Sequence, residues 1–115
     1  MIPKQKKFHK FLLYYRLFLE VVLGGHTETL NTNDDLNNKT NYLKYRSPNG
    51  TITSTIGNIP SSVTGGFMME VLPSSQTSFV IQKLYEYNKP GIYIRQLITG
   101  GAWTNWYKCE GSVVA

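Results

Sequence analysis

Residues that could carry out catalysis are few in this chain, and they are widely spaced. His9 and His26 have no carboxylate or thiol at metal-ligand spacing, so the sequence favours neither a metal site nor general acid–base chemistry. The carboxylate pair Asp34–Asp35 lies in an Asn-rich stretch, which is typical of a solvated turn or a helix cap. The single cysteine, Cys109, has no intramolecular disulfide partner and is interpreted as a structural thiol. We therefore predict no enzymatic activity, no cofactor and no metal.

The remaining side chains suit recognition, because eight Tyr, five Phe and two Trp occur among many Asn, Thr and Ser residues. Aromatic rings offer flat apolar faces, and amides and hydroxyls supply directional hydrogen bonds to sugars or protein surfaces. Trp103, Phe67 and Phe79 are interpreted as core residues. The sequence leaves open whether three tyrosines are core or surface residues: Tyr85, Tyr87 and Tyr107.

The two tryptophans lie three positions apart, directly after Gly100 and Gly101. Strand alternation would place Trp103 and Trp106 on opposite faces, and the glycines disfavour a helix that would bring them together. The segment 99–109 is thus either a strand covered on both sides or a strand bent by a bulge.

The net charge of +5 is not evenly distributed. Residues 1–25 contribute +4, and the remaining ninety residues contribute +1. The body of the chain therefore has no basic field for binding phosphates, and we predict no nucleic-acid partner.

Residues 1–25 differ in composition from the rest of the chain. Apolar residues recur at helical spacing over 8–23, which predicts a basic, amphipathic leader helix. Arg16 and Glu20 interrupt the apolar run, which argues against a signal peptide and against a membrane span of about twenty residues. Two interpretations remain open: a partner helix that docks on its own domain or on copies of itself, and an irregular leader.

Residues 26–115 alternate between short strand-like runs and turn signals. The runs are "YLKYR", "TITSTI", "FMMEVL", "FVIQKLY", "IYIRQLI" and "AWTNWYKC". Such spacing predicts a small antiparallel sheet or sandwich, with hairpins at Asn49–Gly50 and Gly100–Gly101. Both faces of "FVIQKLY" and "IYIRQLI" carry apolar residues, so each face needs a cover from a helix, a second sheet or another subunit. This pattern indicates an oligomer.

The order of motifs over residues 26–110 resembles the pyocin-knob type of domain found at the ends of phage tail fibres and R-type pyocin fibres. The opening motif is Asp35-Leu36-Asn37, within "DDLNNKT". A Pro and a Gly then precede a Val-ending strand in "NIPSSVTGGFMMEVL", and a Gln-bearing strand follows. The close is an Arg, a Gly turn and Trp-x-x-Trp. The matched residues after the opening are Pro60, Gly66, Val71, Gln82, Arg95, Gly101, Trp103 and Trp106.

The resemblance implies a mainly β fold, a small antiparallel β knob at 26–115 preceded by the leader at 1–25. It implies a homotrimer in the tail of a phage or prophage virion, assembled in the cytoplasm with other tail-fibre or baseplate proteins. It further implies attachment to a bacterial surface polysaccharide or lipopolysaccharide. In such a knob, Trp103 lies in the core and Trp106 packs on the other face, near Arg95 or a neighbouring subunit. Independently of the resemblance, positions that look exposed make Tyr85, Tyr87 and Tyr107 candidate ligand-binding residues, and Arg95 and Trp106 are added to them.

Two alternatives remain. One is a purely structural module that trimerises or caps a tail protein and binds no sugar. The other is a bacterial protein tethered to a membrane by residues 8–23, which the interrupted apolar run disfavours.

Overall fold

The structure is a computed structural model that describes residues 10–15, 27–74 and 79–114. Residues 10–15 form a helix whose side chains are all exposed. The rest of the expected leader helix, at 8–9 and 16–23, lies outside the described residues, as does the proposed boundary at residue 25. Within the described part of the chain, no helix has the length and apolar character to cross a membrane.

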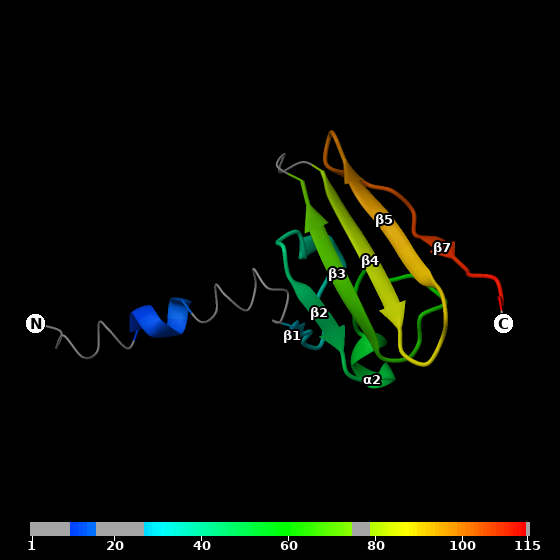
Figure 1. Cartoon of the computed structure of the whole chain (residues 1–115), viewed down its shortest axis with the longest axis horizontal. Coiled ribbons are helices and arrows are strands. Elements are labelled where there is room, and N and C mark those ends of the chain that lie inside the picture. Colours follow the sequence, from blue (N-terminus) through cyan, green and yellow to red (C-terminus); the bar gives the residue numbers. More distant parts are fainter. Residues whose placement is uncertain (1–9, 16–26, 75–78, 115) are drawn as a thin grey trace, which may run out of the picture.

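The domain is built on one seven-stranded sheet (Figure 1). Six strands follow each other in chain order across it, and β7 pairs with β5 beside β6. All pairings are antiparallel except the parallel pair β1–β2. The strands are β1 (Thr27–Thr29), β2 (Lys44–Ser47), β3 (Phe67–Pro73), β4 (Val80–Glu86), β5 (Ile92–Ile98), β6 (Ala102–Trp103) and β7 (Tyr107–Cys109). The predicted mainly β fold is confirmed, and a parallel edge strand is added to it.

The hairpin predicted at Gly100–Gly101 is confirmed, since both glycines have positive φ, +103° and +84°, and connect β5 to β6. The hairpin predicted at Asn49–Gly50 is wrong. Asn49 instead caps the short helix α2 (Gly50–Thr53), accepting a hydrogen bond from the Ile52 amide at 3.0 Å. The expected strand over 51–56 is therefore one helical turn and a bend, favoured by the side-chain cap.

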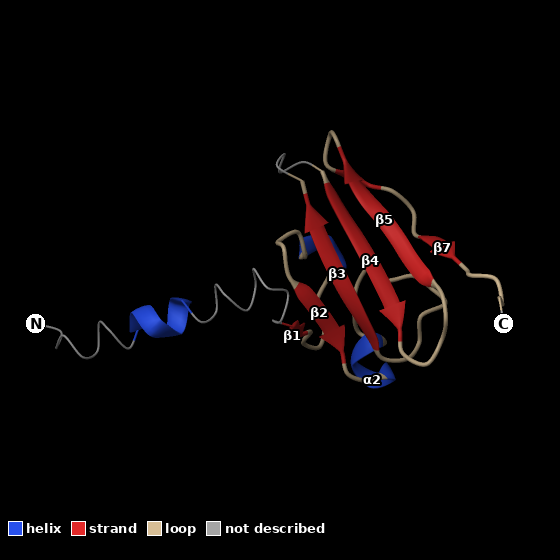
Figure 2. Ribbon diagram, viewed as in Figure 1, coloured by secondary structure: helices blue, strands red, loops and turns tan. Residues whose placement is uncertain are grey.

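One face of the sheet is covered by the segments between β1 and β3, which include the 3-10 helix η1 (Leu36–Asn38) and α2 (Figure 2). This packing buries a single core cluster, because alternate residues of β3, β4 and β5 meet side chains from the covering segments. The core residues are Leu30, Leu36, Tyr45, Ile56, Val63, Phe67, Met69, Val71, Val80, Leu84 and Tyr93. Two polar side chains, Gln82 and Arg95, are buried on the same face.

The opposite face of the sheet, here called the open face, carries the alternate residues of the same strands. Met68, Ile81 and Ile94 lie there with charged neighbours, and all are only half-buried. None of them belongs to the core cluster of the described residues. Both faces of the sheet carry apolar side chains, as predicted. Among the described residues, the segments between β1 and β3 cover one of these faces.

A one-residue bulge explains the spacing of the two tryptophans. Trp103 pairs with Leu97, and Tyr107 pairs with Ile94. Two residues of β5 therefore oppose three residues, 104–106, which shifts the alternation by one position. Trp103 and Trp106 consequently share the covered face, so the bulge interpretation is right. The expectation that Trp106 packs on the other face is wrong.

Candidate functional site

The centre of the candidate site is the guanidinium group of Arg95, whose side chain is 4% exposed. Its Cζ lies 4.1 Å from the ring centroid of Trp103 and 4.6 Å from that of Trp106. Stacking on two indoles compensates part of the lost hydration of the cation. Burial lowers the pKa of Arg95 to about 10, while the charge of Asp35 opposes this shift. The group therefore stays positively charged at neutral pH.

Gln82, fully buried in the middle of β4, connects Arg95 to the covering layer. Its Oε1 accepts a hydrogen bond from Arg95 Nε at 2.8 Å. Its Nε2 donates to the carbonyl oxygens of Leu36 at 2.7 Å and Lys39 at 2.9 Å. Those carbonyls belong to η1 and its C-terminal cap, so one amide fixes η1 over the sheet.

Asp35 caps the N-terminus of η1. Its Oδ1 accepts hydrogen bonds from the Asn37 amide at 2.9 Å and from Asn58 Nδ2 at 2.8 Å. The hydrogen bond from Asn58, the bond from Asn37 and the charge of Arg95 together lower the pKa of Asp35, against a smaller effect of burial. A carboxylate thus lies within electrostatic reach of the Arg95 cation.

A hollow of about 290 Å³ opens beside this network, and we call it the Arg95 hollow. Trp103 and Trp106 form its aromatic walls, and its other lining residues besides Arg95 are Asn37, Asn58, Ile59, Thr104 and Asn105. Two buried atoms of its lining residues, Arg95 Nη2 and Asn37 Oδ1, have no hydrogen-bond partner in the described structure. One donor and one acceptor of the lining residues are therefore unused.

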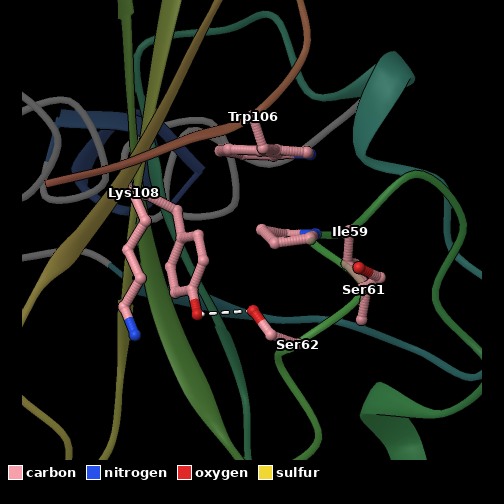
Figure 3. A pocket seen from close by; sticks show the side chains of 7 residues that line it. Ile59, Ser61, Ser62, Trp106 and Lys108 are labelled. Carbon is pink, nitrogen blue, oxygen red and sulfur yellow. Dashed lines mark hydrogen bonds between the residues drawn. The ribbon is translucent and has the colours of Figure 1, made fainter.

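A second hollow, of about 390 Å³, shares Trp106 and Ile59 with the first, and we call it the Tyr93 hollow (Figure 3). A hydrogen bond of 2.7 Å joins the Ser62 and Tyr93 hydroxyls at its far end. The other lining residues are Pro60, Ser61 and Lys108. Together, the two hollows form what we call the Trp106 cleft.

The Trp106 ring is fixed between the two hollows. Its Nε1 donates a hydrogen bond of 2.9 Å to the Asn58 carbonyl, and its ring packs against the core cluster. Lys108, at the edge of the Tyr93 hollow, has its Nζ 2.7 Å from Glu110 Oε1. The cleft is therefore a pre-formed, partly aromatic surface depression lined mainly by hydroxyl and amide groups. Within the described residues, no three His, Cys, Asp or Glu side chains gather as metal ligands would.

The structure brings together two of the five predicted ligand-binding residues, Arg95 and Trp106. Tyr85 lies on the open face, where its hydroxyl donates to Glu70 Oε1 at 2.6 Å, which raises the pKa of Tyr85 to about 12. Tyr107 is exposed and pairs with Ile94, an open-face residue. Tyr87 is exposed in the turn after β4. These three tyrosines do not line the cleft.

The residues matched by the family resemblance lie close together. The Leu36 carbonyl is linked to Arg95 through the side chain of Gln82, and the Asp35 carboxylate attracts Arg95 electrostatically. Arg95 in turn stacks on both tryptophans. Gly101 forms the turn that precedes Trp103. Gly66 lies farther away, where a Cβ would come within 2.9 Å of the Ser47 carbonyl oxygen. Apart from Gly66 and the core residue Val71, the matched residues lie around the cleft.

Sequence reasoning missed most of the remaining lining. Residues 58–62 were predicted only as a turn segment that carries the matched residue Pro60, yet they form one wall of the cleft. The available signal was the Asn-Ile-Pro-Ser-Ser composition, in which Asn58 takes a positive φ of 61° and Pro60 is rigid. The sequence did not indicate which strand such a loop would face.

The fold and this network define the class of domain: a small β domain whose single sheet is covered on one face by irregular segments. No model of a known protein family matches the sequence, and no curated protein is significantly similar to it. A selenomethionine structure of an N-truncated R2-type pyocin tail fibre is similar in fold, with a TM-score of 0.65 and 14% sequence identity. The alignment covers 73% of this chain and 32% of that chain.

The chain thus has the fold of part of that pyocin tail fibre, and it spans about a third of the N-truncated fibre chain. The predicted resemblance to pyocin-fibre domains is confirmed at the level of the fold.

Proposed function

We propose that this chain is an attachment domain of a phage or prophage tail fibre and that it binds a bacterial surface glycan in the Trp106 cleft. The observation that carries the proposal is an aromatic, hydroxyl- and amide-lined cleft on a tail-fibre fold. The indole of Trp106 offers an apolar surface to a sugar ring, and the neighbouring polar groups supply hydrogen bonds to its hydroxyls. The function is attachment without catalysis.

The proposed partners are a surface polysaccharide or lipopolysaccharide, two further copies of the chain, and other fibre or baseplate proteins. The proposed location is the virion tail, after assembly in the cytoplasm. A shallow cleft binds a single sugar segment weakly, so attachment relies on several clefts that act together. In a trimer, three such clefts on one particle raise the overall affinity without any new contact.

The test is binding of the fluorescently labelled full chain to a panel of bacterial strains, before and after periodate oxidation of their surface sugars. We expect some strains to bind and oxidation to abolish binding. The variant Trp106→Ala should lose at least tenfold in affinity, while Tyr42→Ala, which removes an exposed ring outside the cleft, should not. Binding that survives oxidation, or no binding to any strain, would contradict the proposal.

The variant Tyr107→Ala distinguishes glycan binding in the cleft from glycan binding on the open face. Because Tyr107 was predicted as a ligand residue but lies away from the cleft, a strong loss in this variant would place the glycan on the open face instead.

A second candidate function is a structural, trimerising module without glycan binding. The half-buried apolar residues of the open face favour it, since such a face gains from a protein cover. Light scattering on the full chain and on Ile94→Glu tests it. A trimer that dissociates in the variant, together with no glycan binding by the wild type, would replace the first proposal.

A further inference from the structure

The charges around the Trp106 cleft are balanced within the protein. Among the lining residues, Arg95 and Lys108 are the two cations. Arg95 interacts electrostatically with Asp35, and Lys108 pairs with Glu110 at 2.7 Å. Each positive charge therefore already has an acidic neighbour, and an additional carboxylate in the cleft would meet Asp35 and Glu110 as like charges.

The hydrogen-bonding groups of the cleft match a ligand that both donates and accepts. Arg95 Nη2 is an unused donor, and Asn37 Oδ1 is an unused acceptor, both buried. A sugar hydroxyl is compatible with either group, because each hydroxyl donates and accepts. A carboxylate offers only acceptors and would leave Asn37 Oδ1 facing another oxygen. Arg95 itself is 4% exposed and is held by Gln82, so its guanidinium group is fixed before a ligand arrives.

The two hollows are separate but share one wall. Each volume, about 290 and 390 Å³, is at the lower end of small-molecule sites, which run from about 300 to 1,000 Å³. Trp106 and Ile59 belong to both linings. A chain of sugar units that passes over Trp106 would occupy both hollows.

From these observations we infer that the receptor segment is a neutral oligosaccharide, with one sugar unit in each hollow and its hydroxyls against the hydroxyl and amide groups of the lining. The inference rests on the proposed function and specifies its ligand: an uncharged glycan rather than a uronic acid or a phosphorylated sugar. The affinity depends on a ligand at least two units long.

The test uses the labelled full chain on an array of purified bacterial capsular and O-antigen polysaccharides, both neutral and acidic. We expect binding to neutral glycans and at least tenfold weaker binding to acidic ones. The variant Asn105→Asp places a carboxylate at the exposed rim of the Arg95 hollow, and Asn41→Asp makes the same change outside the cleft. Asn41→Asp, outside the cleft, should bind a neutral glycan within about threefold of the wild type. Asn105→Asp should weaken whatever binding of acidic glycans is measured, because its carboxylate adds a like charge to the hollow.

A second pair of variants tests the Tyr93 hollow and leaves the core residues unchanged. One variant blocks the hollow, and the other is its control. Ser61→Tyr fills the hollow from an exposed position, and Ser54→Tyr adds the same ring at an exposed position outside the cleft. We expect Ser61→Tyr to lose at least tenfold in affinity and Ser54→Tyr to bind normally. Circular dichroism of each variant verifies its folding.

The failures of the two proposals are distinguishable. If the chain binds acidic glycans, loses them in Ser61→Tyr and loses them further in Asn105→Asp, the cleft is the receptor site, but the neutral ligand is wrong. That result would indicate that Asn37 presents its amide nitrogen. If the bound sugar binds equally well as a single methyl glycoside, the two-hollow arrangement is wrong. If the folded chain binds nothing on the array, both the inference and the proposed function fail.

Discussion

Replacing Gln82 with leucine removes the three hydrogen bonds that join β4, β5 and η1 while keeping a side chain of similar size. Two of these bonds link neutral groups, at 2.7 and 2.9 Å, and the third, at 2.8 Å, comes from the charged Arg95. At about 1 kcal/mol for each neutral bond and about 2 kcal/mol for the charged one, we expect a loss of about 4 kcal/mol in the free energy of unfolding. The loss is large because the carbonyls of Leu36 and Lys39 are left without their buried partner.

The assay is urea denaturation of the wild type and Gln82→Leu, followed by tryptophan fluorescence and circular dichroism. Both indoles stack on Arg95, so their emission reports directly on the affected network. The matched control is Gln96→Leu, the same change at a half-buried position of the open face, which should alter stability by less than about 0.5 kcal/mol.

A double-mutant cycle tests the pairing itself. Arg95→Met removes the charged donor, so the combined variant should lose less stability than the sum of the two single variants, by about 1 kcal/mol or more. The reasoning is refuted if Gln82→Leu costs less than about 1 kcal/mol, or if the two losses simply add.

Three further predictions concern other parts of the domain. Hydrogen bonds and the charge of Arg95 lower the pKa of Asp35 from 3.8, so the contribution of Asp35 to the free energy of unfolding is present above pH 3.8 and is lost as the pH falls through the lower folded value. The free energy of unfolding should therefore fall more steeply with acid in the wild type than in Asp35→Asn, and equal slopes would contradict this. The pKa of Tyr85 is raised from 10.0 to about 12, so the contribution of Tyr85 to the free energy of unfolding is present below pH 10 and is lost as the pH rises towards 12. Tyr85→Phe should lose this alkaline dependence of stability, which is measured by denaturation between pH 8 and 11. In Gly66→Ala, the new Cβ would lie 2.9 Å from both the Ser47 carbonyl oxygen and Tyr87 Cδ2, so we expect a loss of about 2 kcal/mol by urea denaturation, against no change in Gly111→Ala, which has open space.

The long strands could be predicted from the sequence, and the short elements could not. β3, β4 and β5 show alternation over seven residues each and are bounded by turn residues, so their local pattern agrees with their tertiary environment. The run 51–56 is rich in β-branched residues, but the side-chain cap at Asn49 favours a helical turn, and local composition does not rank these two outcomes. β1 is a short polar segment that becomes a strand only because β2 lies beside it.

The candidate site was predicted in part for a similar reason. Arg95 and Trp106 belong to a sequence motif, and the bulge that unites them was one of two alternatives that the Trp-x-x-Trp spacing allowed. The wall formed by residues 58–62 depends on how a turn-rich segment folds back over the sheet, and no periodicity encodes that path. Tyr85 was placed near a ligand because it looked exposed, whereas exposure alone does not say on which face of the sheet a ring lies.

The parallel pairing of β1 with β2 determines how mechanical tension enters the domain. Any pull from the N-terminal side reaches the sheet first through Thr27–Thr29, which is paired with the outer edge of β2. Hydrogen bonds beside the strand pairing support this attachment: Leu30 donates its amide to the Arg46 carbonyl at 2.8 Å, and Arg46 Nε donates to Thr29 Oγ1 at 3.0 Å. Because β1 is three residues long and lies at the end of the sheet, it would detach under load before the seven-residue strands β3, β4 and β5 separate. Its release would lengthen the chain on the N-terminal side of the sheet while the Trp106 cleft, which no residue of β1 lines, kept its shape, so this edge strand is suited to yield first under tension.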